Sequence, residues 1–179
     1  IMAGKLFNTG QVCVSPDYAF VPEELLRPLI AELEKATSTL FPSIADNPEY
    51  TAIVNENHFR RLQHLISDAT GAGVEIITFN PADEGYEEAA NRKLLPRVLL
   101  DPPDDSAVMR EEIFGPLLPI KSYKQIDEVA RYINAHDRPL ALYYFGNNEQ
   151  HRTQFLNDIV AGGMAVNDVV THVTCHQLP

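Results

Sequence analysis

One of only two cysteines in the chain, Cys13, lies in the stretch "FNTGQVCVSPDYAF" (residues 7–20). A small polar run and a glycine precede it, so we expect a loop between a helix and a strand, where a thiol could be exposed enough to act as a nucleophile. Reactivity requires the thiolate, and the sequence shows no group that would lower the pKa of the thiol. The preceding helix presents its C-terminal end, which opposes ionisation, and Lys5 lies one or two turns back, too far to count on as a partner. The alternative is a buried structural cysteine.

Two adjacent carboxylates form the second candidate site. Glu111 and Glu112 enter an apolar run, "MREEIFGPLLPI" (residues 109–120), which contains a Gly-Pro pair. Neighbouring side chains point in different directions, so one carboxylate could accept hydrogen bonds from a ribose while the other stays in solvent. The alternative is a solvated acidic turn.

Metal-ligand residue types occur near the end of the sequence, at His172, Cys175 and His176. Their spacing is not a standard zinc pattern, so we expect no metal site. A hydrolase that pairs Cys13 with a histidine stays open, although no local signature supports it. The chain has no glycine-rich phosphate-binding motif.

The composition restricts the class of protein. The chain has 179 residues, 45% hydrophobic, and a net charge of −11, which suits one domain and argues against a nucleic-acid surface. No apolar run is long enough to span a bilayer, and the first residues do not resemble a signal peptide. Two cysteines cannot form a disulfide scaffold, so we expect free thiols and a cytoplasmic location.

The elements that must position these residues alternate along the chain. We expect helices at 1–7, 22–36, 55–73, 125–136 and 148–161, with Pro28 delaying or kinking the second, and a polar surface excursion at 80–93. Strand-like runs lie at 17–21, 74–79, 94–100, 117–123, 140–146 and 162–169. This alternation predicts an α/β fold with a mainly parallel, twisted sheet and helices on both faces.

Three segments, in order and with matching separations, resemble the aldehyde dehydrogenase superfamily. They are "FNTGQVCVSPDYAFVP", "EEIFGPLLPI" and "GGMAVNDVVTHVTCHQLP", and the resemblance covers essentially the whole chain. The runs "CVSPDY" and "VNDVVTHVTCHQLP" look closest to the class-three branch, which acts on aromatic, medium-chain and fatty aldehydes. The resemblance implies a Rossmann-like catalytic domain over residues 1–179.

The resemblance also implies a mechanism. Cys13 would attack an aldehyde, such as coniferyl aldehyde or a fatty aldehyde, to give a thiohemiacetal and then a thioester that water hydrolyses. NAD or NADP would accept the hydride, Glu112 would hold the nicotinamide ribose, and Phe114 would pack near the nicotinamide. A semialdehyde or acylating dehydrogenase and a non-catalytic binding domain of the same fold are the alternatives.

Several parts of the family pattern are absent from these 179 residues. They are an N-terminal cofactor-binding domain, a general-base glutamate upstream of the cysteine, and a C-terminal strand that joins subunits. We therefore expect a catalytic-domain fragment with little activity alone, cut from a larger homodimer or homotetramer.

Overall fold

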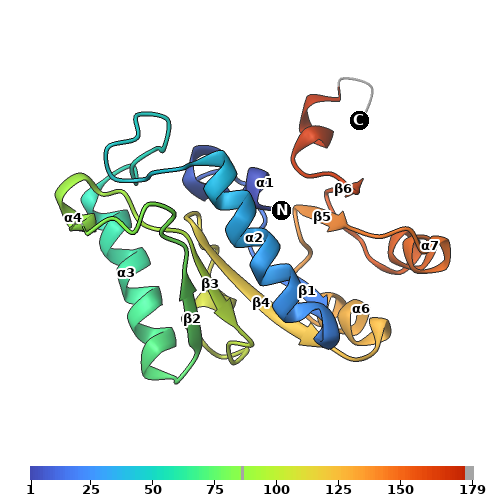
Figure 1. Ribbon diagram of the computed structural model, residues 1–179. Coiled ribbons are helices and arrows are strands. Elements are labelled where there is room, and N and C mark those ends of the chain that lie inside the picture. Colours follow the sequence, from blue (N-terminus) through green and yellow to red (C-terminus); the bar gives the residue numbers. More distant parts are fainter. Residues whose placement is uncertain (86, 176–179) are drawn as a thin grey trace.

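The computed structural model describes residues 1–85 and 87–175, and its largest sheet has four strands. Their order is β1 (Ala19–Pro22), β4 (Leu117–Tyr123), β3 (Arg97–Leu100) and β2 (Glu75–Thr78). The first three run parallel, and β2 is an antiparallel outer strand (Figure 1). The Cys13 segment directly precedes β1, and the Glu111–Glu112 segment directly precedes β4. Because β1 and β4 are parallel neighbours, both segments lie at the same end of the sheet.

Two long helices cover the opposite faces of this sheet. Helix α2 (Leu26–Leu40) buries Ile30 and Leu33 on one face, together with alternate residues of β3 and β4. Helix α3 (Glu56–Gly71) packs Phe59, Leu62 and Leu65 on the other. Side chains alternate across a strand, so consecutive apolar residues of β3 supply both cores.

A smaller part of the fold follows β4. The parallel strands β5 (Ala141–Tyr144) and β6 (Gly163–Val166) form a second sheet, and helices α6 (Ile126–Asn134) and α7 (Glu149–Asp158) pack around a third apolar cluster. In Figure 1 this part lies to the right of the larger sheet, with α6 next to β1. No helix among the described residues is long and apolar enough to cross a membrane.

The α/β class, the mainly parallel strand order and the helices on both faces confirm the sequence prediction. Helix α2 starts late, as Pro28 predicts: a 3₁₀ turn (Glu23–Leu25) precedes it, and Pro28 falls in its first turn, where its missing N–H is not needed. The strands form two sheets where one was expected.

Five short helical segments make up the other helical elements of the described residues. They are α1 (Met2–Leu6) with a following 3₁₀ turn (Phe7–Gly10), α4 (Glu88–Asn91), α5 (Ala107–Arg110) and a 3₁₀ turn (Thr171–Thr174). The excursion at 80–93 is partly anchored, because the Glu84 carboxylate accepts hydrogen bonds from the Ile44 and Ala45 amides at 2.7 and 3.1 Å.

Candidate active site

The Cys13 loop, residues 8–18, starts with an unusual backbone. Asn8, Thr9 and Gly10 all have positive φ, at 49°, 56° and 77°. The chain then turns back on itself, and the Cys13 side chain is exposed. Within the residues that the structure describes, Cys13 is therefore not a buried core residue. Non-glycine residues rarely adopt this conformation unless neighbouring contacts hold them.

Two side chains provide such contacts and tie the Cys13 loop to the rest of the fold. Gln11 is buried, donates through Nε2 to the Ala52 carbonyl at 3.1 Å and accepts from the Val54 amide at 2.9 Å. On the other side of the loop, the Tyr143 hydroxyl donates to the Val14 carbonyl at 2.6 Å. The residues flanking Cys13 are thus fixed, and the sulfur remains open to a reactant.

Glu111 and Glu112, the two adjacent carboxylates of the second candidate segment, have different surroundings, as expected for neighbouring side chains. Glu111 forms an ion pair with Arg61 at 3.2 Å. Glu112 is exposed, and no hydrogen bond or ion pair occupies its carboxylate in the part of the chain that the structure describes. Its oxygens are therefore free to accept hydrogen bonds from a ligand.

Phe114 has a φ of 52°, which is strained for a residue with a large side chain. Helix α3 holds it in this conformation: His58 Nε2 is hydrogen-bonded to the Phe114 carbonyl at 2.7 Å, and the two rings make an edge contact. This arrangement fixes the direction of the Phe114 ring.

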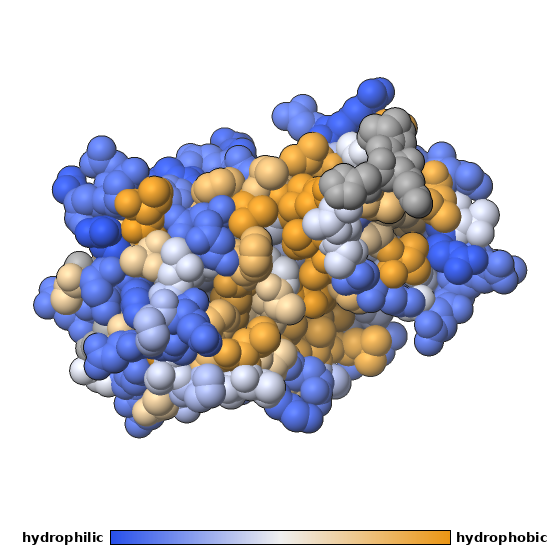
Figure 2. All heavy atoms as spheres, turned by 90° about the horizontal axis from the view of Figure 1, so that it is seen from above, coloured by the Kyte–Doolittle hydropathy of each residue, from blue (hydrophilic) through white to orange (hydrophobic). Residues whose placement is uncertain are grey.

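One large cavity brings the candidates together. Cys13, Glu112 and Phe114 all line a cavity of about 820 Å³, which extends between β1, α6 and β5. Its other lining residues are mostly apolar or aromatic, among them Phe20 and Tyr144. Figure 2 shows apolar atoms gathered across the middle of the upper face of the molecule. The cavity could hold an apolar or aromatic substrate against an exposed thiol and a free carboxylate.

A close backbone approach sets the distance between the two candidate segments. A Cβ atom added at Gly10 would lie 2.2 Å from the Gly115 carbonyl oxygen. Only glycine fits at position 10, because the site requires both a positive φ and the absence of a side chain. The Cys13 loop and residues 112–115 therefore pack backbone against backbone.

Sequence reasoning missed the electrostatic interaction between the buried Lys5 ammonium and the partly buried Asp17 carboxylate. Lys5 is 1% exposed, and burial lowers the pKa of its ammonium to about 8, while the charge of Asp17 acts in the opposite direction. Burial likewise raises the pKa of Asp17, against the effects of Lys5, the Ile113 amide and Arg61. The sequence offers only two signals for this interaction: a lysine, Lys5, within an apolar helix, and an aspartate, Asp17, four residues after Cys13.

Two of the three possible metal ligands near the end of the sequence, His172 and Cys175, lie within the described residues. His172 packs edge-on against Tyr143, and Cys175 is exposed. His176 lies outside the described residues. Within residues 1–85 and 87–175, no three His, Cys, Asp or Glu side chains are grouped to hold a metal ion.

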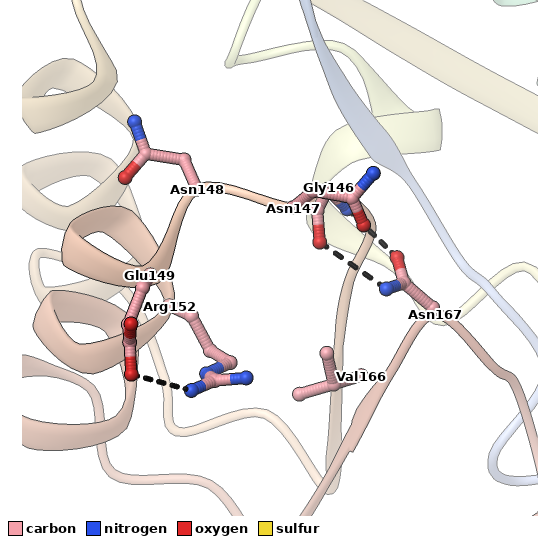
Figure 3. Close-up of a pocket in the computed structure, with 7 residues that line it drawn as sticks. All are labelled: Gly146, Asn147, Asn148, Glu149, Arg152, Val166 and Asn167. Carbon is pink, nitrogen blue, oxygen red and sulfur yellow. Dashed lines mark hydrogen bonds and ion pairs between the residues drawn. The ribbon is translucent and has the colours of Figure 1, made fainter.

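A second, smaller hollow of about 140 Å³ lies at the turn between β5 and α7 (Figure 3). Asn167 closes one side of it by accepting from the Gly146 amide at 2.8 Å and donating to the Gly146 carbonyl at 3.2 Å. Arg152 is paired with Glu149 at 3.3 Å. None of the candidate residues lines it, so the larger cavity is the candidate active site.

Comparison with known proteins identifies the family. The family model described as "Aldehyde dehydrogenase family" matches residues 1–179 of the chain. The chain is 46% identical to "Probable coniferyl aldehyde dehydrogenase" of Caulobacter vibrioides and 37% identical to mouse "Aldehyde dehydrogenase family 3 member A2". The match to the Caulobacter protein covers 100% of this chain and 37% of that protein. The match to the mouse protein covers 98% of this chain and 34% of that protein.

A solved structure agrees with these relatives. "Substrate bound state of Staphylococcus Aureus AldH" is 35% identical and superposes with a TM-score of 0.88, over 99% of this chain and 37% of that one. The fold, the family match over residues 1–179 and the class-three-like relatives agree with the resemblance noted in the sequence. The chain belongs to the aldehyde dehydrogenase family.

Proposed function

We propose that this chain is the catalytic domain of an NAD(P)-dependent aldehyde dehydrogenase that oxidises an aldehyde to the carboxylic acid. The observation that carries the proposal is the meeting of Cys13, Glu112 and Phe114 on one cavity. The chain spans about a third of its relatives' length, so the rest of the site, including a general base and most cofactor contacts, would come from other parts of the full-length protein.

The Cys13 thiolate attacks the aldehyde carbonyl carbon and forms a C–S bond, and the carbonyl oxygen becomes an alkoxide. The Cys13 backbone N–H has no acceptor among the described residues, so it is free to donate a hydrogen bond to this oxygen. Hydride then leaves the same carbon, which leaves a thioester on Cys13. Water hydrolyses the thioester, so that the acid is released and the thiolate returns.

The nicotinamide cofactor, when bound, supplies the hydride acceptor. The residues present fit this group: Glu112 offers an unpaired carboxylate to two ribose hydroxyls, and Phe114 offers a ring fixed by His58. Both line the cavity that Cys13 enters, so these two side chains would position the acceptor over the adduct.

The substrate that we propose is an aromatic aldehyde such as coniferyl aldehyde. The cavity contains the aromatic residues Tyr18, Phe20 and Tyr123, and the relative from Caulobacter is named for this substrate class. Turnover of coniferyl aldehyde, benzaldehyde and a long-chain aliphatic aldehyde by the full-length protein tests this choice. A higher kcat/KM for the aliphatic aldehyde would contradict it.

The reaction is tested by replacing each cysteine in turn in the full-length protein. We expect Cys13→Ser to lower aldehyde oxidation, followed by the absorbance of reduced cofactor, by about a thousandfold or more. Cys175→Ser is the matched control, because both thiols are exposed, and it should keep its activity. Iodoacetamide should also label Cys13 faster than Cys175. Undiminished oxidation by Cys13→Ser would refute the proposed function.

A further inference from the structure

Asp17 connects the two segments of the candidate active site. It follows Cys13 in the same loop, and its Oδ1 accepts a hydrogen bond from the Ile113 backbone N–H at 3.0 Å. Ile113 lies between Glu112 and Phe114, the two residues proposed to face the cofactor. One side chain thus joins the nucleophile loop to the middle of the cofactor segment, across 96 residues of sequence.

The opposite side of the same segment is held by helix α3. Arg61 donates to the Ile113 carbonyl, and His58 is hydrogen-bonded to the Phe114 carbonyl. Ile113 itself is fully buried, so its side chain does not enter the cavity. The peptide groups around Ile113 are therefore clamped from two directions, and Asp17 is the side that moves with Cys13.

Lys5 supplies the charge that suits Asp17 to this task. Its ammonium is fully buried and has no hydrogen-bond partner among the residues that the structure describes. Asp17 is the anion whose field acts on it, and Lys5 in turn favours the ionised form of Asp17. A carboxylate accepts a stronger hydrogen bond from an amide than a neutral group does.

We propose that Asp17 is a positioning residue, which sets the placement of Glu112 and Phe114 relative to Cys13, and that Lys5 is its buried counter-charge. This inference rests on the proposed function for its catalytic consequence. Removing the acceptor should loosen the cofactor segment while Cys13 keeps its chemistry. Hydride transfer should then suffer, because it depends on the distance between the adduct and its acceptor.

The test compares two variants of the full-length protein that differ in whether the side chain at position 17 offers a hydrogen-bond acceptor. Lys5→Met/Asp17→Asn keeps an oxygen for the Ile113 amide, and Lys5→Met/Asp17→Leu replaces it with a group of similar size. Both lack the buried ammonium, so neither leaves an unpaired buried charge that would unfold the protein.

We expect the Leu variant to lose about tenfold or more in kcat/KM for the nicotinamide cofactor, relative to the Asn variant. Iodoacetamide labelling of Cys13 should stay within about twofold, because the loop retains its Gln11 and Tyr143 contacts. The inference would be overturned if the two variants had equal kcat/KM for the cofactor. It would also be overturned if Cys13 labelling in the Leu variant fell by the same factor as its kcat/KM.

A second readout does not depend on aldehyde oxidation. Hydrogen–deuterium exchange of the peptide covering residues 110–116 should be about tenfold faster in the Leu variant than in the Asn variant. If the protein oxidises no aldehyde but this difference appears, the proposed function fails and the structural link stands. Equal exchange in both variants would refute the link, whatever the activity.

Discussion

Replacing Gly10 by alanine tests the close approach between the Cys13 loop and residues 112–115. The added Cβ would lie 2.2 Å from the Gly115 oxygen and 2.6 Å from its carbonyl carbon, both backbone atoms that cannot rotate away. Gly73 provides a matched control: its φ is 76°, against 77° for Gly10, and nothing lies within 4 Å of its added Cβ. The two substitutions therefore share the backbone strain and differ in the clash.

The expected magnitudes follow from these two terms. We expect Gly73→Ala to lower the free energy of unfolding by about 1 kcal/mol, which is the cost of a positive φ for alanine. Gly10→Ala carries the same cost and adds about 3 kcal/mol, because the two segments must separate to relieve the clash. It should also lower aldehyde oxidation, since the separation moves Glu112 away from Cys13.

Urea denaturation of the two variants in the full-length protein, with aldehyde oxidation in parallel, measures both effects. Gly73→Ala should retain full activity. If the two variants lose the same free energy of unfolding, or if Gly10→Ala keeps its activity, the close approach does not set the geometry of the site.

Three further predictions concern stability. The pKa of Lys5 is about 8, against an ordinary 10.5, because burial disfavours its ammonium. The free energy of unfolding should therefore rise by about 3 kcal/mol between pH 8 and pH 10.5, as the buried ammonium loses its proton. In Lys5→Met, unfolding measured against pH should lack this rise. Arg97→Met should lower the free energy of unfolding by about 2 kcal/mol, because this guanidinium and its carboxylate partner are 14% and 19% exposed. Arg27→Met should leave it unchanged by the same urea measurement, since that pair is 65% and 53% exposed, and an equal loss in the two variants would contradict the reasoning. Tyr143→Phe removes the 2.6 Å hydrogen bond to Val14 and should cost about 1 kcal/mol in thermal unfolding, with a lower rate of aldehyde oxidation; an unchanged melting temperature would show that this bond does not hold the Cys13 loop.

The long elements of the fold could be predicted from sequence because their signals are local. Helix α3 shows its apolar stripe at Phe59, Leu62 and Leu65, and Pro28 marks the late start of α2. The four-residue helix α5 is too short to show a period, so it was missed. The division of the strands into two sheets depends on hydrogen bonds between distant segments, which no local pattern records.

The candidate site was only partly accessible to sequence reasoning. The family resemblance named Cys13, Glu112 and Phe114, and the structure places them on one cavity. The contacts that hold them, by contrast, join residues far apart: Gln11 binds the backbone 41 and 43 residues away, and Asp17 binds it 96 residues away. Residue types alone do not reveal such pairings, because most Gln and Asp residues lie exposed on the surface without a distant partner.

The positive φ of Phe114 limits how this site can be re-engineered. A branched Cβ, as in valine or isoleucine, is strongly disfavoured at such a backbone angle, whereas glycine and asparagine adopt it readily. A library that varies position 114 to change cofactor or substrate preference should therefore exclude β-branched residues. It should also keep His58, whose hydrogen bond to the carbonyl of residue 114 is independent of the side chain placed there.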